Sequence, residues 1–173
     1  MPFTLRQATA ADAPALTAVY QSSFSTDAIG KLVFPPTEAT AKFWTASVLE
    51  EIAHPNYHFI CIVSKEDDSD EEKIVAYAKW NDPGAPHPDP TALPKWPEGG
   101  DHELGDYFFG TLFSRHNEIL GERKHWYLEI LAVSNEYQGK GCGGMLIRWA
   151  CKSSTFSHIL CGHPHLGLGE MEP

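Results

Sequence analysis

A glycine-rich stretch late in the chain, EYQGKGCGG at residues 136–144, holds the residues best suited to chemistry. Glycine has no Cβ atom, so a turn built from it can bring successive backbone N–H groups close to the oxygens of a phosphate. The N-terminus of a following helix would add its positive end to the same anion. One glycine is enough for a strand-to-helix turn, whereas this stretch has four within six positions, which favours an anion-binding loop.

The glycine spacing fits more than one kind of nucleotide-containing ligand. Gly139, Gly141 and Gly144 form the G-x-G-x-x-G pattern of a dinucleotide site, which should directly follow the first strand of a βαβ unit and precede an acidic strand end. Here five residues separate the preceding apolar run from Gly139, and the next acidic candidate, Glu170, lies in a tail that contains Gly and Pro. The G-K-[ST] sequence of a P-loop does not occur. A nucleotide-dependent enzyme is therefore the less favoured hypothesis.

The surrounding sequence fits a different motif. The segment LEILAVSNEYQGKGCGGMLIRWA (128–150) resembles motif A of the GNAT acetyltransferases, in which a strand ending in Val is followed by x-P-x-x-Q/R-x-x-G-x-G/A and a helix. Val133 takes the strand-end position, and Ser134-Asn135 replaces the usual x-Pro. The signature positions are taken by Gln138, Gly141 and Gly143.

The resemblance implies a ligand and the residues that hold it. In this family the loop N–H groups bind the pyrophosphate of acetyl-CoA, and the backbone of the preceding strand pairs with the pantetheine arm. The chain is therefore expected to use acetyl-CoA as cosubstrate, without a metal ion. Ten coenzyme-binding residues are implied on this strand and loop: Leu131, Ala132, Val133, Gln138, Gly139, Lys140, Gly141, Cys142, Gly143 and Gly144.

The candidate catalytic residue is Glu129, an acidic residue inside the apolar strand-like run WYLEILAV. Acyl transfer to an amine needs a base that removes a proton from the nitrogen. In many GNAT enzymes an acidic residue on this strand is that base, so the resemblance assigns the role to Glu129. A buried carboxylate there would have a raised pKa, which suits a base near neutral pH. The alternative is a Glu paired with a Lys or Arg across the sheet, and Tyr127 and His125 are further candidates.

The composition limits the partners. The chain of 173 residues is 42% hydrophobic, as in an ordinary globular protein, and has a net charge of −10. Nucleic acids and anionic membranes require clustered Lys and Arg, so neither is expected, whereas a cationic amine would be attracted. The start lacks a signal-peptide pattern, no run approaches the ~18 apolar residues of a membrane span, and the cysteines show no C-x-x-C spacing. These features predict a cytoplasmic protein with reduced thiols.

Periodicity and the resemblance together predict an α/β (α+β) fold of the GNAT type, with a mixed, mainly antiparallel sheet flanked by helices. Strands are expected at residues 3–9, 57–63, 73–80 and 125–133. Helices are expected at residues 12–24, 37–52, 103–120 and 144–152. Asp12 and Thr37 are the candidate N-caps of the first two helices. This order resembles the family's order from about Phe3 to Lys152.

The acceptor side of the predicted fold contains a proline-rich insertion at residues 81–101. Six prolines exclude a helix or a central strand there, so the insertion is either a lid over a site or a mobile excursion. Four aromatic residues of the preceding helical region either line the acceptor site or belong to the core: Phe24, Phe34, Phe43 and Trp44.

The end of the chain departs from the family. We expect one GNAT-like domain at residues 1–152, followed by an atypical, poorly ordered tail at 153–173. Family members continue with a fifth strand, a fourth helix and a closing hairpin, so the resemblance implies truncation after the motif A helix and incomplete C-terminal strands. Cys161, His163 and His165 have no matching ligand cluster upstream, so no metal site is predicted.

The sequence thus predicts an enzyme that transfers an acetyl group from acetyl-CoA to an amine of a small molecule or peptide. The alternative is a catalytically inactive truncated remnant that at most binds CoA. The identity of the acceptor and the oligomeric state stay open.

Overall fold

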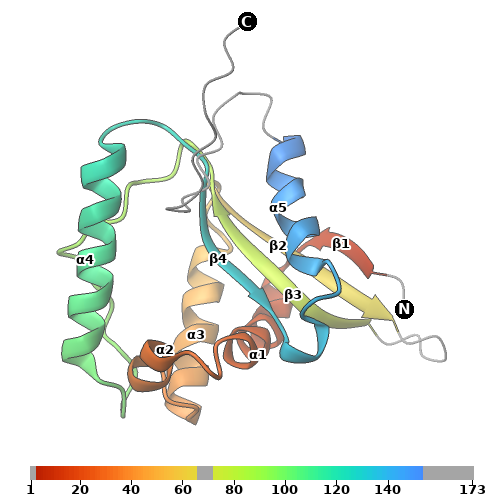
Figure 1. The fold of residues 1–173 in the computed structure, drawn as a ribbon, viewed down its shortest axis with the longest axis horizontal. Helices are drawn as coiled ribbons and strands as arrows, with labels where there is room; N and C mark the ends of the chain where they lie inside the picture. The colour runs from red at the N-terminus through yellow and green to blue at the C-terminus, as the bar shows by residue number, and fades with distance from the viewer. Residues whose placement is uncertain (1–2, 66–71, 154–173) are drawn as a thin grey trace, which may run out of the picture.

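The computed structural model describes residues 3–65 and 72–153, and within them four strands form one antiparallel sheet in the order β1-β2-β3-β4 (Figure 1). The strands are β1 (Phe3–Gln7), β2 (Tyr57–Lys65), β3 (Glu72–Asn81) and β4 (Tyr127–Val133). β2 and β3 pair along their whole length, from Tyr57 opposite Asn81 to Lys65 opposite Glu72. β4 pairs with β3 on one side, and no described strand pairs with its other edge.

Side-chain alternation along the strands creates an apolar layer on each face of the sheet. Phe59, Cys61 and Val63 of β2 pack with α1 (Ala13–Ser23) and α3 (Glu38–Glu51). The intervening residues, Ile60 and Ile62, pack on the opposite face with Leu146 and Ala150 of α5 (Cys142–Ser153). Figure 1 shows this arrangement, with α5 on one face and α1 and α3 on the other. Complete burial of each leucine or isoleucine side chain contributes about 2 kcal/mol to the layers.

The beginning of α1 corrects one expectation. Asp12 precedes α1, but its side chain makes no hydrogen bond to the first turn of that helix. Instead its carboxylate accepts from the Thr9 N–H (2.7 Å) and pairs with both terminal nitrogens of Arg6 (2.8 and 2.9 Å). Through its contact with Thr9 it caps the start of the short 3-10 helix η1 (Ala10–Asp12), which leads into α1. The charged guanidinium forms stronger bonds with the carboxylate than the N–H groups of α1 would.

The other predicted elements are confirmed, each end lying within two residues of the observed one. Thr37 caps α3 as expected, because its hydroxyl oxygen accepts from the Thr40 N–H (3.2 Å). Within the described residues every strand pair is antiparallel, in line with the expected mainly antiparallel sheet. No helix of the described chain is long and apolar enough to cross a membrane. The predicted tail beyond residue 153, with Cys161, His163 and His165, lies outside the described residues.

Among the α-helices of the described residues, α2 (Ala28–Val33) was not predicted. It has six residues, which is under two turns and too short to display a hydrophobic period. Asp27 caps it by accepting from the Gly30 N–H. Val33, at its end, is fully buried with Phe34 and Trp96 in a third apolar cluster, which also includes residues of α4 (His102–Leu120).

The proline-rich insertion packs against this third cluster. Trp96 is 6% exposed, and its indole N–H donates to Asp106 of α4 (2.7 Å). A Cβ atom at Gly105 would lie 2.8 Å from the indole, so a glycine is required where α4 passes this ring. Figure 1 shows α4 set apart from the sheet, with the insertion leading from the end of β3 past α4 to the start of that helix. Of the two hypotheses for the insertion, this packing favours a lid.

Candidate active site

The glycine-rich loop leads from the end of β4, through the 3-10 helix η2 (Asn135–Tyr137), into α5. Gly139 and Gly141 have φ angles of 74° and 88°, in the left-handed region that residues with a Cβ atom rarely adopt. α5 begins at Cys142, two residues earlier than expected, so Gly143 and Gly144 lie in its first turn. The N–H groups of a first turn have no partner inside the helix and are available to an anion. The loop therefore offers backbone N–H groups to an anion.

Gln138, a signature residue, forms hydrogen bonds that hold this loop to the end of β4. Its side-chain amide donates to the Val133 carbonyl and to Oδ1 of Asn135, both at 3.1 Å. The loop is also tied to the end of α1, because the N–H of Asn135 donates to the Ser22 hydroxyl and that of Val133 to the Ser23 hydroxyl, both at 3.2 Å. Sequence reasoning missed the two serines, because polar residues on an amphipathic helix carry no signal of such contacts.

Two cationic side chains lie beside the loop. Lys140 Nζ is 4.8 Å from the ring centre of Tyr137. Arg148 lies one helical turn after Gly144, and a Cβ at Gly144 would be 3.1 Å from its Nη1 atom. The missing side chain at Gly144 therefore lets the guanidinium group lie back toward the start of α5. In a chain with a net charge of −10, such local cations are what can neutralise phosphate charge. Arg148 was not among the coenzyme-binding residues predicted from the sequence.

Glu129 belongs to a cluster of charged and polar side chains around a buried lysine. Lys79 Nζ donates to Oε1 of Glu129 (2.8 Å) and to Oε1 of Glu51 (2.5 Å). Asn81 donates from its side-chain amide to Oε2 of Glu129 (2.9 Å). Lys79 and Asn81 come from β3, the strand beside β4, and Glu51 comes from the end of α3. The cross-strand pairing that was the alternative for Glu129 is thus present, and it holds both carboxylate oxygens.

Burial and charge set the protonation of this cluster. The Lys79 side chain is only 2% exposed. Burial lowers the pKa of Lys79, but the carboxylates of Glu129 and Glu51 outweigh it, so the pKa is raised and the lysine is a cation at neutral pH. Burial raises the pKa of Glu51, against the opposing attraction of Lys79. Glu129 is not the buried carboxylate that was expected, because 29% of its side-chain surface is accessible.

The cluster forms one side of a cavity of about 640 Å³, here called the acceptor pocket. Polar residues on the sheet side include Tyr57, Lys79, Asn81, Tyr127 and Glu129. The apolar wall is formed by Phe34, Phe43, Trp44, Trp96, Phe109 and Phe113. The proline-rich insertion supplies further lining residues from Pro86 to Trp96, as a lid would. Of the four aromatic residues singled out in the sequence, Phe24 does not line this pocket and packs against the core beside α1.

Two residues of the cluster carried different signals in the sequence. Lys79 is a lysine within the apolar run KIVAYAKW, the same kind of signal that marked Glu129 in WYLEILAV, and could have been found in the same way. Glu51 is an acidic residue near a helix end, where such residues are common, so nothing distinguished it. Only the packing of α3 beside the sheet brings it to Lys79.

The thiols near the core are poorly suited to nucleophilic chemistry. Cys61 and Cys142 are free and buried. Burial raises the pKa of Cys61 to about 11 and also raises the pKa of Cys142, so both remain protonated at neutral pH. Among residues 3–65 and 72–153, no group of three or more His, Cys, Asp or Glu side chains is arranged to hold a metal ion.

Comparison with known proteins places these features in a family context. The model of the acetyltransferase (GNAT) family matches residues 26–155. No curated protein matches significantly. A mosquito structure, arylalkylamine N-acetyltransferase like 5b, has the same fold: 16% identity, a TM-score of 0.54, and coverage of 88% of this chain and 70% of the mosquito chain. A Brucella melitensis GNAT acetyltransferase, solved with acetyl-CoA, gives 14% identity, a TM-score of 0.46, and coverage of 88% and 68%. A GNAT-family structure from Desulfovibrio desulfuricans gives 17% identity, a TM-score of 0.46, and coverage of 88% of this chain but 65% of that one.

Proposed function

The chain belongs to the GNAT acetyltransferase family, and on this premise we propose that it transfers an acetyl group from acetyl-CoA to an amine of a small molecule or peptide. The proposal has two parts, a coenzyme site at the glycine-rich loop and a base in the acceptor pocket. β4 connects them, because Glu129 and Val133 belong to the same strand and the loop begins directly after it.

The coenzyme part of the proposal rests on the loop backbone. Acetyl-CoA would supply the activated acetyl group as a thioester. We propose that its pyrophosphate is bound by the N–H groups of the loop and of the first turn of α5, with Lys140 and Arg148 adding positive charge. The pantetheine arm would pair with the edge of β4 that no described strand occupies. The residues proposed to bind the coenzyme are the ten predicted from the sequence: Leu131, Ala132, Val133, Gln138, Gly139, Lys140, Gly141, Cys142, Gly143 and Gly144.

The catalytic part of the proposal assigns the base to Glu129. An amine reaches the active site mainly as an ammonium ion and must lose a proton before its lone pair can attack a carbonyl carbon. Glu129 would accept that proton, directly or through a water molecule. Lys79 and Asn81 act as positioning residues, because each holds one oxygen of the carboxylate at hydrogen-bond distance. Attack would then form the bond from nitrogen to the acetyl carbon and break the bond from that carbon to sulfur. CoA would leave as the thiolate, and the second proton that the nitrogen loses on becoming an amide would neutralise it.

The charge of the acceptor pocket supports an amine as acceptor. Glu50, Glu51, Asp89 and Glu129 line it, against a single lysine, Lys79. The acidic excess attracts a cation, and the aromatic wall can cover an apolar part of the same molecule. These observations support an amine with an apolar segment.

The single observation that carries the proposal is Glu129, held at both oxygens beside the acceptor pocket. Its test is Glu129→Gln, which keeps the shape and removes the base. We expect amine-dependent release of the CoA thiol from acetyl-CoA to fall by about 10²–10⁴-fold, while calorimetric affinity for CoA stays unchanged. Glu38→Gln is the matched control, because Glu38 is an exposed carboxylate of α3 outside the acceptor pocket and its neutralisation should leave the rate nearly intact.

A second candidate function is a binding module that holds CoA without turnover. The chain spans 65% of the length of the Desulfovibrio structure. The observation that favours this alternative is the second edge of β4, with which no described strand pairs. It predicts calorimetric binding of CoA together with no amine-dependent thiol release from any of a panel of primary amines. Measurable amine-dependent release would exclude it. For the cellular location we propose the cytoplasm, supported by the unpaired thiols of Cys61 and Cys142.

A further inference from the structure

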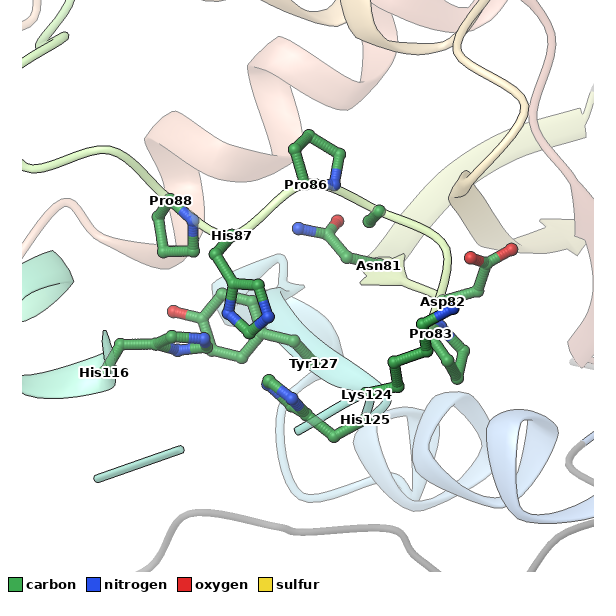
Figure 2. Close-up of a pocket in the computed structure, with 11 residues that line it drawn as sticks. Asn81, Asp82, Pro83, Pro86, His87, Pro88, His116, Lys124, His125 and Tyr127 are labelled. Atoms are coloured by element: carbon green, nitrogen blue, oxygen red, sulfur yellow. The ribbon is translucent and has the colours of Figure 1, made fainter. Parts of the chain in front are cut away.

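A second, much smaller cavity adjoins the acceptor pocket, and three histidines meet beside it (Figure 2). His87 comes from the proline-rich insertion, His116 from α4, and His125 from the segment between α4 and β4. Their ring centres are 5.0 to 5.9 Å apart. Figure 2 shows the three imidazole rings turned toward one another beside the ring of Tyr127. We call these three histidines the histidine cluster.

The tautomer of His125 is fixed by the backbone. Its Nδ1 atom lies 2.7 Å from the Arg123 carbonyl oxygen, which can only accept, so Nδ1 carries the proton. In a neutral imidazole the other nitrogen, Nε2, then presents a lone pair. His125 is 8% exposed, and Nε2 is buried without a hydrogen-bond partner within the described chain. A buried acceptor left unmatched is costly, so this atom requires a donor that residues 3–65 and 72–153 do not supply.

Asn81 provides a second unmatched acceptor. Its amide nitrogen donates to Glu129, so the other amide atom is the oxygen. That oxygen is buried and has no partner within the described part of the chain. Asn81 lines both the small cavity and the acceptor pocket, as do His87 and Tyr127. The small cavity is therefore a polar extension of the acceptor pocket, and both of its unmatched atoms are acceptors.

The size of the cavity limits the donor. Its volume of about 20 Å³ admits one atom of the size of a water oxygen or an amine nitrogen. The pKa of His116 is lowered by burial and by the neighbouring His125 and His87, so its imidazole is neutral at pH 7. A neutral imidazole offers a lone pair. An ammonium group, with three N–H donors, matches a site where several imidazoles converge.

Two charged residues also line the small cavity, Lys124 and Asp82. Lys124 is exposed, so solvent screens its repulsion of a cation. Asp82 is partly buried and bound to His58 and Asn56, and it opposes the charge of Lys124. The aromatic faces of Tyr127 and the imidazoles add attraction for a cation.

We propose that the histidine cluster and Asn81 bind a second amino group of the acceptor, so that the substrates are diamines or longer polyamines. This inference rests on the proposed function, because it takes the acceptor pocket as the site of the reacting amine. Glu129 and His125 are four residues apart along one extended segment, which separates them by about 13 Å. A chain of methylene groups of comparable length would lie between them, along Tyr127 and beneath the proline-rich insertion.

The test compares two amines that differ only in the second amino group, octamethylenediamine and n-octylamine. Calorimetry on the full chain with CoA present should show the diamine binding about tenfold more tightly. His125→Phe keeps a ring of similar size without the lone pair and should remove the preference. His125→Gln restores an acceptor and should recover part of it. His116→Phe, at a less buried position, is expected to weaken the preference as well and guards against a folding defect at His125.

The results test the diamine site and the proposed acetyl transfer separately. Affinities within about twofold of each other in the wild-type chain, or no binding of either amine, would mean that the cavity holds only water and would overturn the inference. A preference that survives His125→Phe would overturn it as well. If the diamine is preferred but neither amine releases thiol from acetyl-CoA, the binding site stands and the proposed catalysis fails. Thiol release without a preference leaves catalysis standing and removes the diamine site.

Discussion

Replacing Lys79 by methionine should leave two carboxylates in the active site without their cation. Methionine is unbranched and of similar length, so it fills the same space without the charge. Lys79 is 2% exposed and contacts Glu51 and Glu129 at 2.5 and 2.8 Å. Removing one partner of a buried ion pair costs about 3–5 kcal/mol. The two carboxylate side chains keep 31% and 29% of their surface accessible, and solvent screening reduces the expected loss to about 2–4 kcal/mol.

The sign of the pH dependence follows from the shifted groups. The pKa of Glu51 is raised by burial even with Lys79 present, so the folded state binds this proton more tightly than the unfolded chain does. Without the lysine that pKa rises further. The destabilisation should therefore be largest at about pH 8 and should shrink as the pH falls through the raised pKa of Glu51, where the carboxyl becomes neutral. In the wild-type chain the contribution of Lys79 is complete at neutral pH and is lost only when the pH rises above its raised pKa.

The measurement is urea unfolding of both proteins at about pH 8 and about pH 5, followed by circular dichroism. A loss of about 2–4 kcal/mol corresponds to a melting temperature roughly 5–15 °C lower for a domain of this size. The double variant Lys79→Met with Glu51→Gln is the control, and it should recover part of the stability because it removes one of the unpaired charges. An equal loss at both pH values, or no recovery in the double variant, would refute the electrostatic reasoning.

Three further predictions concern other parts of the structure. Gly141→Ala should weaken CoA binding about tenfold by calorimetry without unfolding the chain, because φ is 88° there while a Cβ meets nothing within 4 Å. Asp12→Asn should cost about 1 kcal/mol at pH 7 in urea unfolding, through the weakened contact with Arg6, which is partly exposed. Because Arg6 lowers the pKa of Asp12, this difference is present above the ordinary Asp pKa and should disappear as the pH falls through the lowered one. Trp96→Ala should cost about 3 kcal/mol and accelerate hydrogen exchange in residues 81–101, whereas unchanged exchange would mean that the ring does not anchor the insertion.

The strands and most helices could be predicted because their side-chain patterns are local. Alternation along β2 and the helical spacing in α3 reflect burial of one face, and this periodicity can be read without knowledge of the partner. The same logic marked Glu129 as a charged residue in an apolar strand. It failed for α2, which is too short to show a period, and for the capping by Asp12, where Arg6 of β1 offered stronger bonds.

What the sequence determined by itself was the backbone chemistry of the glycine-rich loop, because positive φ angles and a helix start depend on neighbouring residues alone. The tertiary structure decided which distant side chains meet. Glu51 reaches Lys79 only because α3 packs beside the sheet, and His87 reaches His116 and His125 only because the proline-rich insertion folds between α4 and β4. Contacts across such separations depend on the sum of many weak packing energies, and no short sequence pattern records that sum.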